Sequence, residues 1–514
     1  MHFRNHIFIL FLALAGSTAG NPWVSELRAQ EEASIRGTVT GKAGLLEGGY
    51  VGAHATGKTF TTYVMTDATG QFTFRGLAPG SYGVFTRIPG FRTVRTDGIN
   101  VEAGKEAAVD VQVEPETDFL KLVEQATNSE LTESFPLSPA QKEALAYRCG
   151  DCHGAYYIAK SRFTREDWAM IVAKMDDQGS ITPAGDMGPP PRMSRPSARP
   201  PSVEHPGSDD ESIARVLGQF RGPDSPDFPI QFQPRATGKL TRVIVTEYQI
   251  PRLGATPRTV VIDPRGDYVW YSDWRANYLG RVNIQTGEIK EYPIPGVKFR
   301  PPGLQRLRWD PMGNLLAGQI WAGRAIRFDV NTERVTGIWD TPLEWARAGG
   351  VGICRSGPDG PIRYLITDAL VRRQGWIIDP ETDQRTEVAL RWGGPVSDCD
   401  RGRSYNWEGA RAKRAIIYRD PETGTIREFA ILSPWARPQN AVGDPVRNVG
   451  WSVPAVIDRV VKADLNTGEV TEFPLPSHGK TILNIDIETS ADPPVLWFVN
   501  QRQGRIVRFQ EYTE

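Results

Sequence analysis

The sequence predicts a multidomain, mainly β protein: an N-terminal β-sandwich, a small all-α domain and a C-terminal β-propeller of six or seven blades. The chain has 514 residues, which is too long for one compact core and suggests about three domains. It contains 51 glycines and 40 prolines, and because these residues punctuate turns, many short strands are favoured over long helices. A degenerate repeat of about 40–50 residues in the second half of the chain indicates the propeller.

Residues 1–30 have the pattern of a signal peptide. Arg4 and His6 give a weakly basic start, and a short apolar run from Ile7 to Ala15 is followed by small residues. The run is too short to span a bilayer, which needs about 20 apolar residues. No later segment is apolar enough to cross a membrane. We therefore expect a periplasmic or secreted mature protein without a membrane span.

Residues 31–116 alternate apolar and polar side chains between turn signals, as expected for a small β-sandwich. The clearest strands are expected at 34–41, within 70–93 and at 109–115. This stretch resembles the carboxypeptidase regulatory-like domain, a β-sandwich of transthyretin type. The matching residues are Thr66, Asp67, Gly70, Phe72, Leu77, Pro79, Gly80, Ser81, Tyr82, Pro89, Gly90 and Phe91. The resemblance implies an adhesion, spacer or docking role without catalytic residues.

Residues 117–225 change to helical patterns. Ser138 and Pro139 are an N-cap and a first helical residue, and the helix that they start runs into residue 149. Thr164 and Asp167 resemble a capping box at the start of a second helix. That helix, over 165–179, places four apolar residues on one face: Trp168, Ile171, Val172 and Met175. A third helix is expected over 210–220, so that three helices surround a Cys-x-x-Cys-His motif at 149–153, an arrangement that indicates a small cytochrome c domain.

Cys149, Cys152 and His153 form a Cys-x-x-Cys-His motif. In such a motif the two thiols add to the vinyl groups of haem, and the adjacent histidine reaches the iron from one face. We therefore expect one covalent haem c on Cys149 and Cys152, with His153 as an axial ligand. A redox Cys-x-x-Cys pair and half of a zinc site are the alternatives, but no second pair of zinc ligands lies nearby.

Two methionines compete for the sixth position on the iron. The motif and the helix after it resemble small cytochrome c domains of periplasmic dehydrogenases, in which a methionine follows a tryptophan by seven residues. Trp168 and Met175 have this spacing, so the resemblance implies Met175 as the ligand. Met187 is the alternative, because it lies in a proline-rich loop over 183–206 and many cytochromes present methionine from such a loop. His205 is a third candidate.

Residues 235–514 repeat one strand pair. It recurs at 281–295, 327–342, 376–390, 416–432 and 461–476. An Asp-x-x-Thr-Gly pattern within the pair is typical of a hairpin turn between the outer strands of a propeller blade. A spacing of about 40–50 residues fits one four-stranded blade per repeat. A parallel solenoid is the alternative, and the hairpin turns favour antiparallel blades.

The repeats resemble the propeller of the streptogramin (virginiamycin B) lyases. The resemblance rests on Pro257 and Arg258 with the strand that follows, and on segments 278–295 and 460–476. It implies a magnesium ion held by histidine and glutamate near the propeller axis. This propeller has one histidine, His478, and the strand ends that would carry acids are Asp273, Asp368 and Asn500.

The formal net charge is −1, which gives no electrostatic argument for nucleic acid or an anionic membrane as a partner. Two cysteines outside the haem motif, Cys354 and Cys399, could form a disulfide in an oxidising compartment. Two buried free thiols fit the sequence equally well.

Three functions fit these patterns. In the first, the haem relays electrons to or from a periplasmic partner, and the propeller is a platform for a carbohydrate or other small molecule. In the second, the propeller is a dehydrogenase site, with a quinone cofactor such as pyrroloquinoline quinone, and the haem accepts its electrons. In the third, the propeller is a lyase-like enzyme with magnesium and the haem is accessory. The residues that could line a pocket are Arg300, Arg306, Arg308, Trp309, Asp398 and Asp400.

Overall fold

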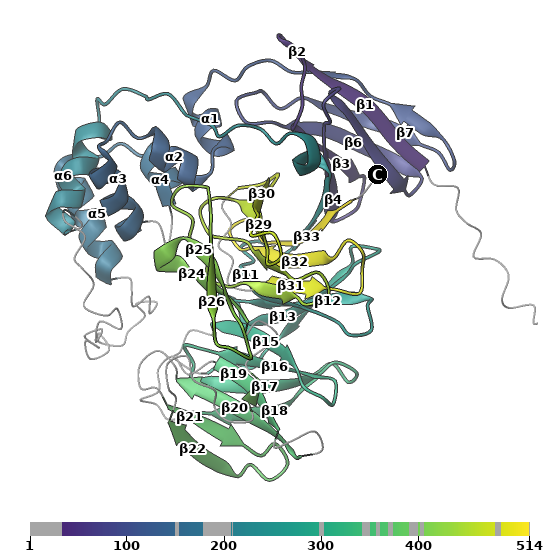
Figure 1. Cartoon of the computed structure of the whole chain (residues 1–514), viewed down its shortest axis with the longest axis vertical. Coiled ribbons are helices and arrows are strands. Elements are labelled where there is room, and N and C mark those ends of the chain that lie inside the picture. The colour runs from purple at the N-terminus through teal and green to yellow at the C-terminus, as the bar shows by residue number, and fades with distance from the viewer. Residues whose placement is uncertain are drawn as a thin grey trace, which may run out of the picture.

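The computed structural model contains three units (Figure 1). The purple β-sandwich and the blue helical domain lie side by side, and the propeller, coloured teal to yellow, lies below them. The structure describes residues 33–149, 154–177, 207, 209–297, 303–341, 350–355, 360–368, 374–389, 399–400, 406–478 and 485–512. The predicted signal peptide of residues 1–30 lies outside these ranges.

The N-terminal sandwich buries an apolar core between two sheets. One sheet joins β1 to β2, β5, β8 and β9, and the other contains β3, β4, β6 and β7. The core includes Val39, Val51, Phe72 and Val84. Strand prediction is confirmed where it was made, although it missed five of the strands named next. The strands are β1 (Ala33–Gly41), β2 (Gly44–Leu45), β3 (Tyr50–Ala55), β4 (Phe60–Met65), β5 (Gln71–Leu77), β6 (Gly80–Arg87), β7 (Arg95–Val101), β8 (Glu106–Ala108) and β9 (Val111–Gln112).

Six helices of the described chain form the helical domain: α1 (Phe119–Gln125), α2 (Asn128–Ser134), α3 (Pro139–Cys149), α4 (Gly154–Lys160), α5 (Arg165–Asp177) and α6 (Asp210–Phe220). They share a core that includes Leu131, Leu145, Trp168 and Leu217. The predicted starts are confirmed for α3 and α5. The backbone N–H of Gln141 donates to Ser138 Oγ over 3.4 Å, and that of Asp167 donates to Thr164 Oγ1 over 3.1 Å. The short helices α1, α2 and α4 were not predicted.

The propeller consists of six successive antiparallel sheets in the described residues. Apolar clusters join sheets one and two, two and three, four and five, five and six, and six and one. The parallel solenoid is therefore wrong. Sheet one contains β11 (Pro257–Ile262), β12 (Tyr268–Asp273), β13 (Tyr278–Asn283) and β14 (Ile289–Pro293), and sheet two contains β15 (Leu304–Trp309), β16 (Asn314–Gln319), β17 (Arg324–Asp329) and β18 (Arg334–Asp340). Sheet three contains β19 (Gly350–Arg355), β20 (Ile362–Asp368), β21 (Gln374–Ile378), β22 (Arg385–Ala389) and β23 (Cys399–Asp400), and sheet four contains β24 (Trp407–Ala410), β25 (Ala415–Arg419) and β26 (Ile426–Ala430). Sheet five contains β27 (Val442–Asp444), β28 (Val449–Ser452), β29 (Arg459–Asp464) and β30 (Val470–Pro474), and sheet six contains β31 (Ile485–Glu488), β32 (Val495–Asn500), β33 (Arg505–Glu511) and β10 (Val243–Gln249).

The predicted turns between outer strands are confirmed, and each is held by a short acidic or amide side chain. Asp464 Oδ1, between β29 and β30, accepts from the backbone N–H groups of Asn466 and Thr467 at 2.7 and 3.0 Å. Asn283, Asp329, Asp379 and Asp420 accept in the same way in the other sheets. These bonds replace backbone partners that a turn otherwise leaves to water, which explains the recurrence of this residue type.

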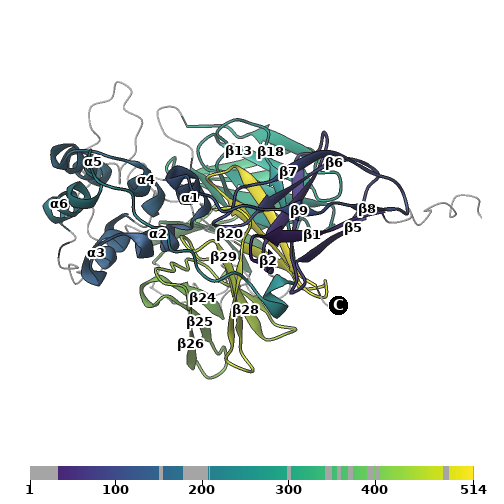
Figure 2. The same cartoon turned by 90° about the horizontal axis from the view of Figure 1, so that it is seen from above.

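The last propeller sheet continues into the sandwich. Strand β10 pairs with β33 on one side and with β4 on the other, so that eight strands form one sheet in the order β31, β32, β33, β10, β4, β3, β6, β7. One apolar cluster runs through both units and includes Tyr63 of the sandwich with Val245 and Phe509 of the propeller. A shared ladder and a shared core join the sandwich to the propeller, and the two units lie side by side in both views (Figures 1 and 2).

The helical domain rests on one face of the propeller, which we call the top face. This face carries the connections between the second and third strands of each sheet, such as 274–277 and 501–504. Ser129 of α2 donates from its backbone N–H to Val456 O over 2.9 Å and from its Oγ to Pro434 O over 2.7 Å. Trp435 Nε1 donates to Glu133 Oε1 over 2.5 Å. These contacts lie on the connections of sheets four and five.

Candidate functional site

The segment that contains the Cys-x-x-Cys-His motif connects α3 to α4. Cys149 is the last residue of α3, and Gly154 begins α4 directly after His153. Cys149 is half-buried, is not disulfide-bonded and packs against the helical core. A thiol in this position fits attachment of haem at the edge of a helical core. Cys152 and His153 lie outside the described residues.

The apolar face of α5 points into the helical domain, as predicted. Trp168 and Val172 are buried, Ile171 packs against the same core, and Trp168 Nε1 donates to Arg221 O over 3.1 Å. Met170, by contrast, is 58% exposed. Met175 stands seven residues after Trp168 along α5, a spacing of about two helical turns. Its side chain, Met187 and His205 lie outside the described residues.

Two contacts join the helices on either side of the motif to the top face of the propeller. The guanidinium of Arg437, in the connection before β27, donates to the carbonyl of Ala146 in the last turn of α3. The guanidinium of Arg502, after β32, lies 5.4 Å from the ring centroid of Tyr157 in α4. Ala146 and Tyr157 lie on either side of the motif in the sequence.

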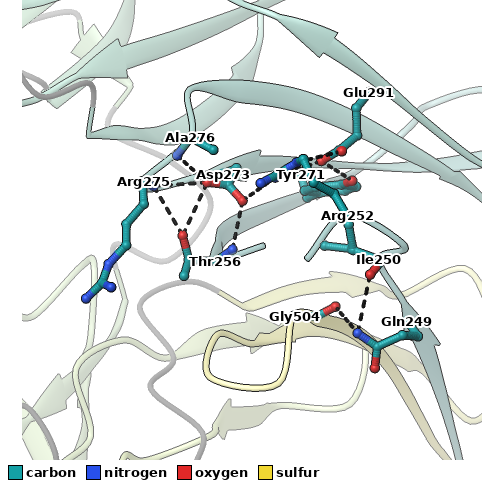
Figure 3. Close-up of polar contacts among 10 residues, drawn as sticks. All are labelled: Gln249, Ile250, Arg252, Thr256, Tyr271, Asp273, Arg275, Ala276, Glu291 and Gly504. Atoms are coloured by element: carbon teal, nitrogen blue, oxygen red, sulfur yellow. Dashed lines mark hydrogen bonds and ion pairs between the residues drawn. The ribbon is translucent and has the colours of Figure 1, made fainter. Parts of the chain in front are cut away.

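Asp273, one of the predicted strand-end acids, has a structural role (Figure 3). It is fully buried, and its carboxylate accepts from the backbone N–H groups of Thr256, Arg275 and Ala276 at 2.7, 2.9 and 2.7 Å. It also accepts from Thr256 Oγ1 at 3.2 Å and from Arg252 at 2.6 Å. Five donors leave no lone pair directed at a ligand. Asp273 therefore fixes the connection 274–277 instead of binding a metal ion.

Arg252 extends the same network to Glu291, to which it donates over 2.8 and 3.0 Å. Tyr271 Oη donates to the same carboxylate over 3.0 Å. Burial and the Glu291 charge raise the pKa of Tyr271, so the phenol stays protonated at neutral pH. The network is a fixed support for the first sheet, with donors and acceptors matched.

Two other residues named from the lyase resemblance, Asn500 and His478, lie close to neighbouring polar groups of the chain. Asn500 Nδ2 donates to Ser477 Oγ over 3.2 Å, and its Oδ1 accepts from Gln503 N over 3.3 Å. His478 Nδ1 lies 3.6 Å from Asp458 Oδ2. The side chain of Asp368 lies outside the described residues. Within the described ranges, no group of three or more histidine, cysteine, aspartate and glutamate side chains could hold a metal ion.

A cavity of about 710 Å³ opens where the three units meet. Its lining carries both signs of charge: Arg87, Arg92, Arg95, Lys121, Arg235, Arg459, Glu116, Glu124, Glu130 and Asp458. Several of these charges are already engaged, for example Arg92 with Glu116 at 3.9 Å and Lys121 with Glu124 at 3.1 Å. A lining of mixed and partly paired charge selects no ligand class.

In the described chain no helix is long and apolar enough to cross a membrane.

Cys354 is disulfide-bonded, and its backbone pairs with that of Cys399 in the ladder between β19 and β23. Of the two alternatives for this cysteine, the free thiol is therefore wrong.

Among the residues expected to line a pocket, Arg308 Nε donates to Val351 O over 3.0 Å and Trp309 Nε1 to Ile262 O over 2.7 Å. Both tie neighbouring sheets together. Arg300 and Asp398, and the side chain of Asp400, lie outside the described residues.

The family comparison matches the N-terminal sandwich and not the rest of the chain. Residues 34–114 match the carboxypeptidase regulatory-like domain family, which confirms the expectation for the N-terminal sandwich. No curated protein matches the chain.

Solved structures that resemble the chain include two lyases and a β-propeller domain. The virginiamycin B lyase of Staphylococcus aureus is 16% identical and covers 52% of this chain and 100% of its own, with a TM-score of 0.32. A streptogramin B lyase is 14% identical over 54% and 100%, with a TM-score of 0.39. The Swd1 propeller domain of Myceliophteria thermophila is 10% identical over 51% and 98%, with a TM-score of 0.37.

Proposed function

We propose that this chain is an exported monohaem c-type cytochrome that relays electrons in the periplasm or outside the cell, with the propeller as its binding platform. The observation that carries the proposal is the Cys-x-x-Cys-His motif between α3 and α4, at the edge of an independent helical core. Cys149 is half-buried against that core. Haem held in this way supplies one-electron chemistry.

The chain itself would contribute the attachment, the axial ligands and the surroundings of the iron. Cys149 and Cys152 would hold the porphyrin, and His153 would bind the iron from one side. The inward orientation of the α5 face supports Met175 as the second ligand, with Met187 as the alternative. Methionine ligation raises the reduction potential, which suits transfer of electrons to another protein.

A second candidate is a haem-linked dehydrogenase, in which the propeller binds the molecule that is oxidised. It is favoured by the contacts of Ala146 and Tyr157 with the top face of the propeller, because the motif lies between these two residues in the sequence. A lyase-like reaction has no comparable observation in its favour.

The test of the main proposal is the optical spectrum of the mature protein, with the haem confirmed as covalent by mass. We expect a c-type spectrum that is lost in the double variant Cys149→Ser, Cys152→Ser; covalent haem in that variant would refute the proposal. We also expect a charge-transfer band from methionine to ferric iron that Met175→Ala abolishes. Met170→Ala is the matched control, because Met170 lies on the exposed face of the same helix. Loss of the band in Met187→Ala instead would make Met187 the ligand.

A further inference from the structure

Two arginines at the centre of the top face have no acidic partner among the described residues. Arg258 is the second residue of β11 and Arg306 lies in β15. These strands are the innermost of sheets one and two and pack against each other. Burial lowers the pKa of Arg258, and the positive charge of Arg306 lowers it further, with no acidic group opposing them. Both guanidinium groups remain charged at neutral pH, so they repel each other.

Local backbone geometry gives Arg306 its direction. It has a positive φ of 56°, which is unfavourable for a long L side chain. A bulge interrupts the pairing of β15 with β16 between Gln305 and Arg308, and bulges turn side chains away from the normal alternation. The Arg306 backbone N–H donates to Thr259 Oγ1, beside Arg258, over 3.0 Å. Arg306 is accessible to solvent, while the protein atoms around it lower its pKa through partial desolvation.

Aromatic rings form a wall beside the pair. The Arg258 guanidinium lies 4.3 Å from the ring centroid of Trp274. The rings of Trp274 and Trp321 are 4.2 Å apart at 63°. Arg258 Nη1 donates to Gln501 Oε1 over 3.1 Å, whereas its buried Nε has no hydrogen-bond partner. The network of Asp273 holds the connection that carries Trp274 (Figure 3).

We propose that Arg258, Arg306 and the Trp274–Trp321 wall form a binding site for a small organic carboxylate at the mouth of the propeller axis. A carboxylate matches the planar fork of a guanidinium and would neutralise two like charges at once. The indole rings would contact the apolar part of the ligand. Inorganic phosphate would use the charges but leave the rings without a partner, so the wall favours an aromatic or otherwise planar acid.

This inference deepens the proposed function and rests on it, because that function gives the reason why a ligand would bind here. Gln501, which holds Arg258, is followed by Arg502, which contacts Tyr157 of α4. The proposed site is thus joined through two adjacent residues to the helix that follows the haem motif. Binding itself requires no haem, so the two proposals can fail separately.

The test titrates the full chain with benzoate, followed by tryptophan fluorescence and calorimetry, with benzyl alcohol and inorganic phosphate as comparisons. Haem-loaded protein and the haem-free Cys149→Ser, Cys152→Ser variant are both titrated. We expect saturable binding of benzoate to both forms. Benzyl alcohol should bind at least tenfold more weakly because it lacks the carboxylate that makes a charge-assisted hydrogen bond. Phosphate should also bind at least tenfold more weakly, because it has no ring to contact the tryptophans. Binding to the haem-free form alone would mean that the arginines neutralise the carboxylates of the haem, and would overturn the proposal.

Arg306→Gly is the decisive variant, because it removes the side chain and also relieves the positive φ. Benzoate affinity should fall at least tenfold, while the unliganded protein becomes as stable as the parent or more stable, because a repulsive charge is gone. Arg258→Met should likewise weaken binding at least tenfold. Arg275→Met is the matched control, since Arg275 adjoins Trp274 but its exposed side chain points away from the network (Figure 3). Unchanged affinity in Arg306→Gly, or an equal loss in Arg275→Met, would refute the site.

Discussion

Replacing Arg252 with methionine tests the network that supports the first propeller sheet. Arg252 makes three charge-assisted hydrogen bonds, one to Asp273 and two to Glu291. Removal of one partner of a buried ion pair costs about 3–5 kcal/mol. Asp273 keeps its four other donors, and Glu291 keeps Tyr271 Oη and is partly exposed. We therefore expect a smaller loss of stability for Arg252→Met, of about 2–4 kcal/mol.

The assay is guanidinium unfolding of the full chain, followed by tryptophan fluorescence, with Arg324→Met as the control. Arg324 forms a similar two-bonded pair with Asp340 in the second sheet, but the Asp340 side chain is 60% exposed. An exposed pair contributes about 0–1 kcal/mol. If both variants lose the same free energy of unfolding, burial of Asp273 does not control the value of the pair and the reasoning is wrong.

Four further changes have expected outcomes. Gly450→Ala would place a Cβ 2.1 Å from the Trp407 ring and should cost about 1–3 kcal/mol in chemical unfolding, whereas Gly41→Ala, with 3.6 Å to its nearest neighbour, should be close to neutral. Thr246→Pro, in the strand shared by sandwich and propeller, should cost about 3 kcal/mol or more and speed amide exchange in β4 and β33; exchange faster in only one of them would argue against a single sheet. Cys354→Ala should lower stability by about 2–4 kcal/mol, and non-reducing mass analysis of the parent should show one disulfide. Asp464→Ala should cost about 1 kcal/mol of stability at pH 7. Backbone N–H groups lower the folded pKa of Asp464, so its contribution is present above the unfolded pKa of about 3.9 and disappears as pH falls through the folded pKa. Equal losses of stability at pH 7 and pH 2 would contradict this prediction.

Prediction succeeded where the signal was local. The helix over 210–220 was placed without error, and the turn at Asp464 was recognised from five consecutive residues, because caps and turns depend on neighbours in sequence. Helix α4 was missed because it is only seven residues long and has no cap signal. Asp273 was singled out from the sequence as a strand-end acid for a metal site, but its role as a saturated support depends on Arg252 and on the backbone of 274–277.

The sequence by itself determined the order of the three units, the Cys-x-x-Cys-His motif with the N-capped helix before it, and the repeat that becomes the propeller. Periodicity, caps and turn chemistry act over a few residues, and they can therefore be read along the chain. Only the tertiary structure decided that β10 joins the sandwich to the last propeller sheet, and that Arg258 and Arg306 stand together beside Trp274. Strand pairing and like-charge proximity between distant residues depend on the final packing, and no short stretch of sequence encodes them.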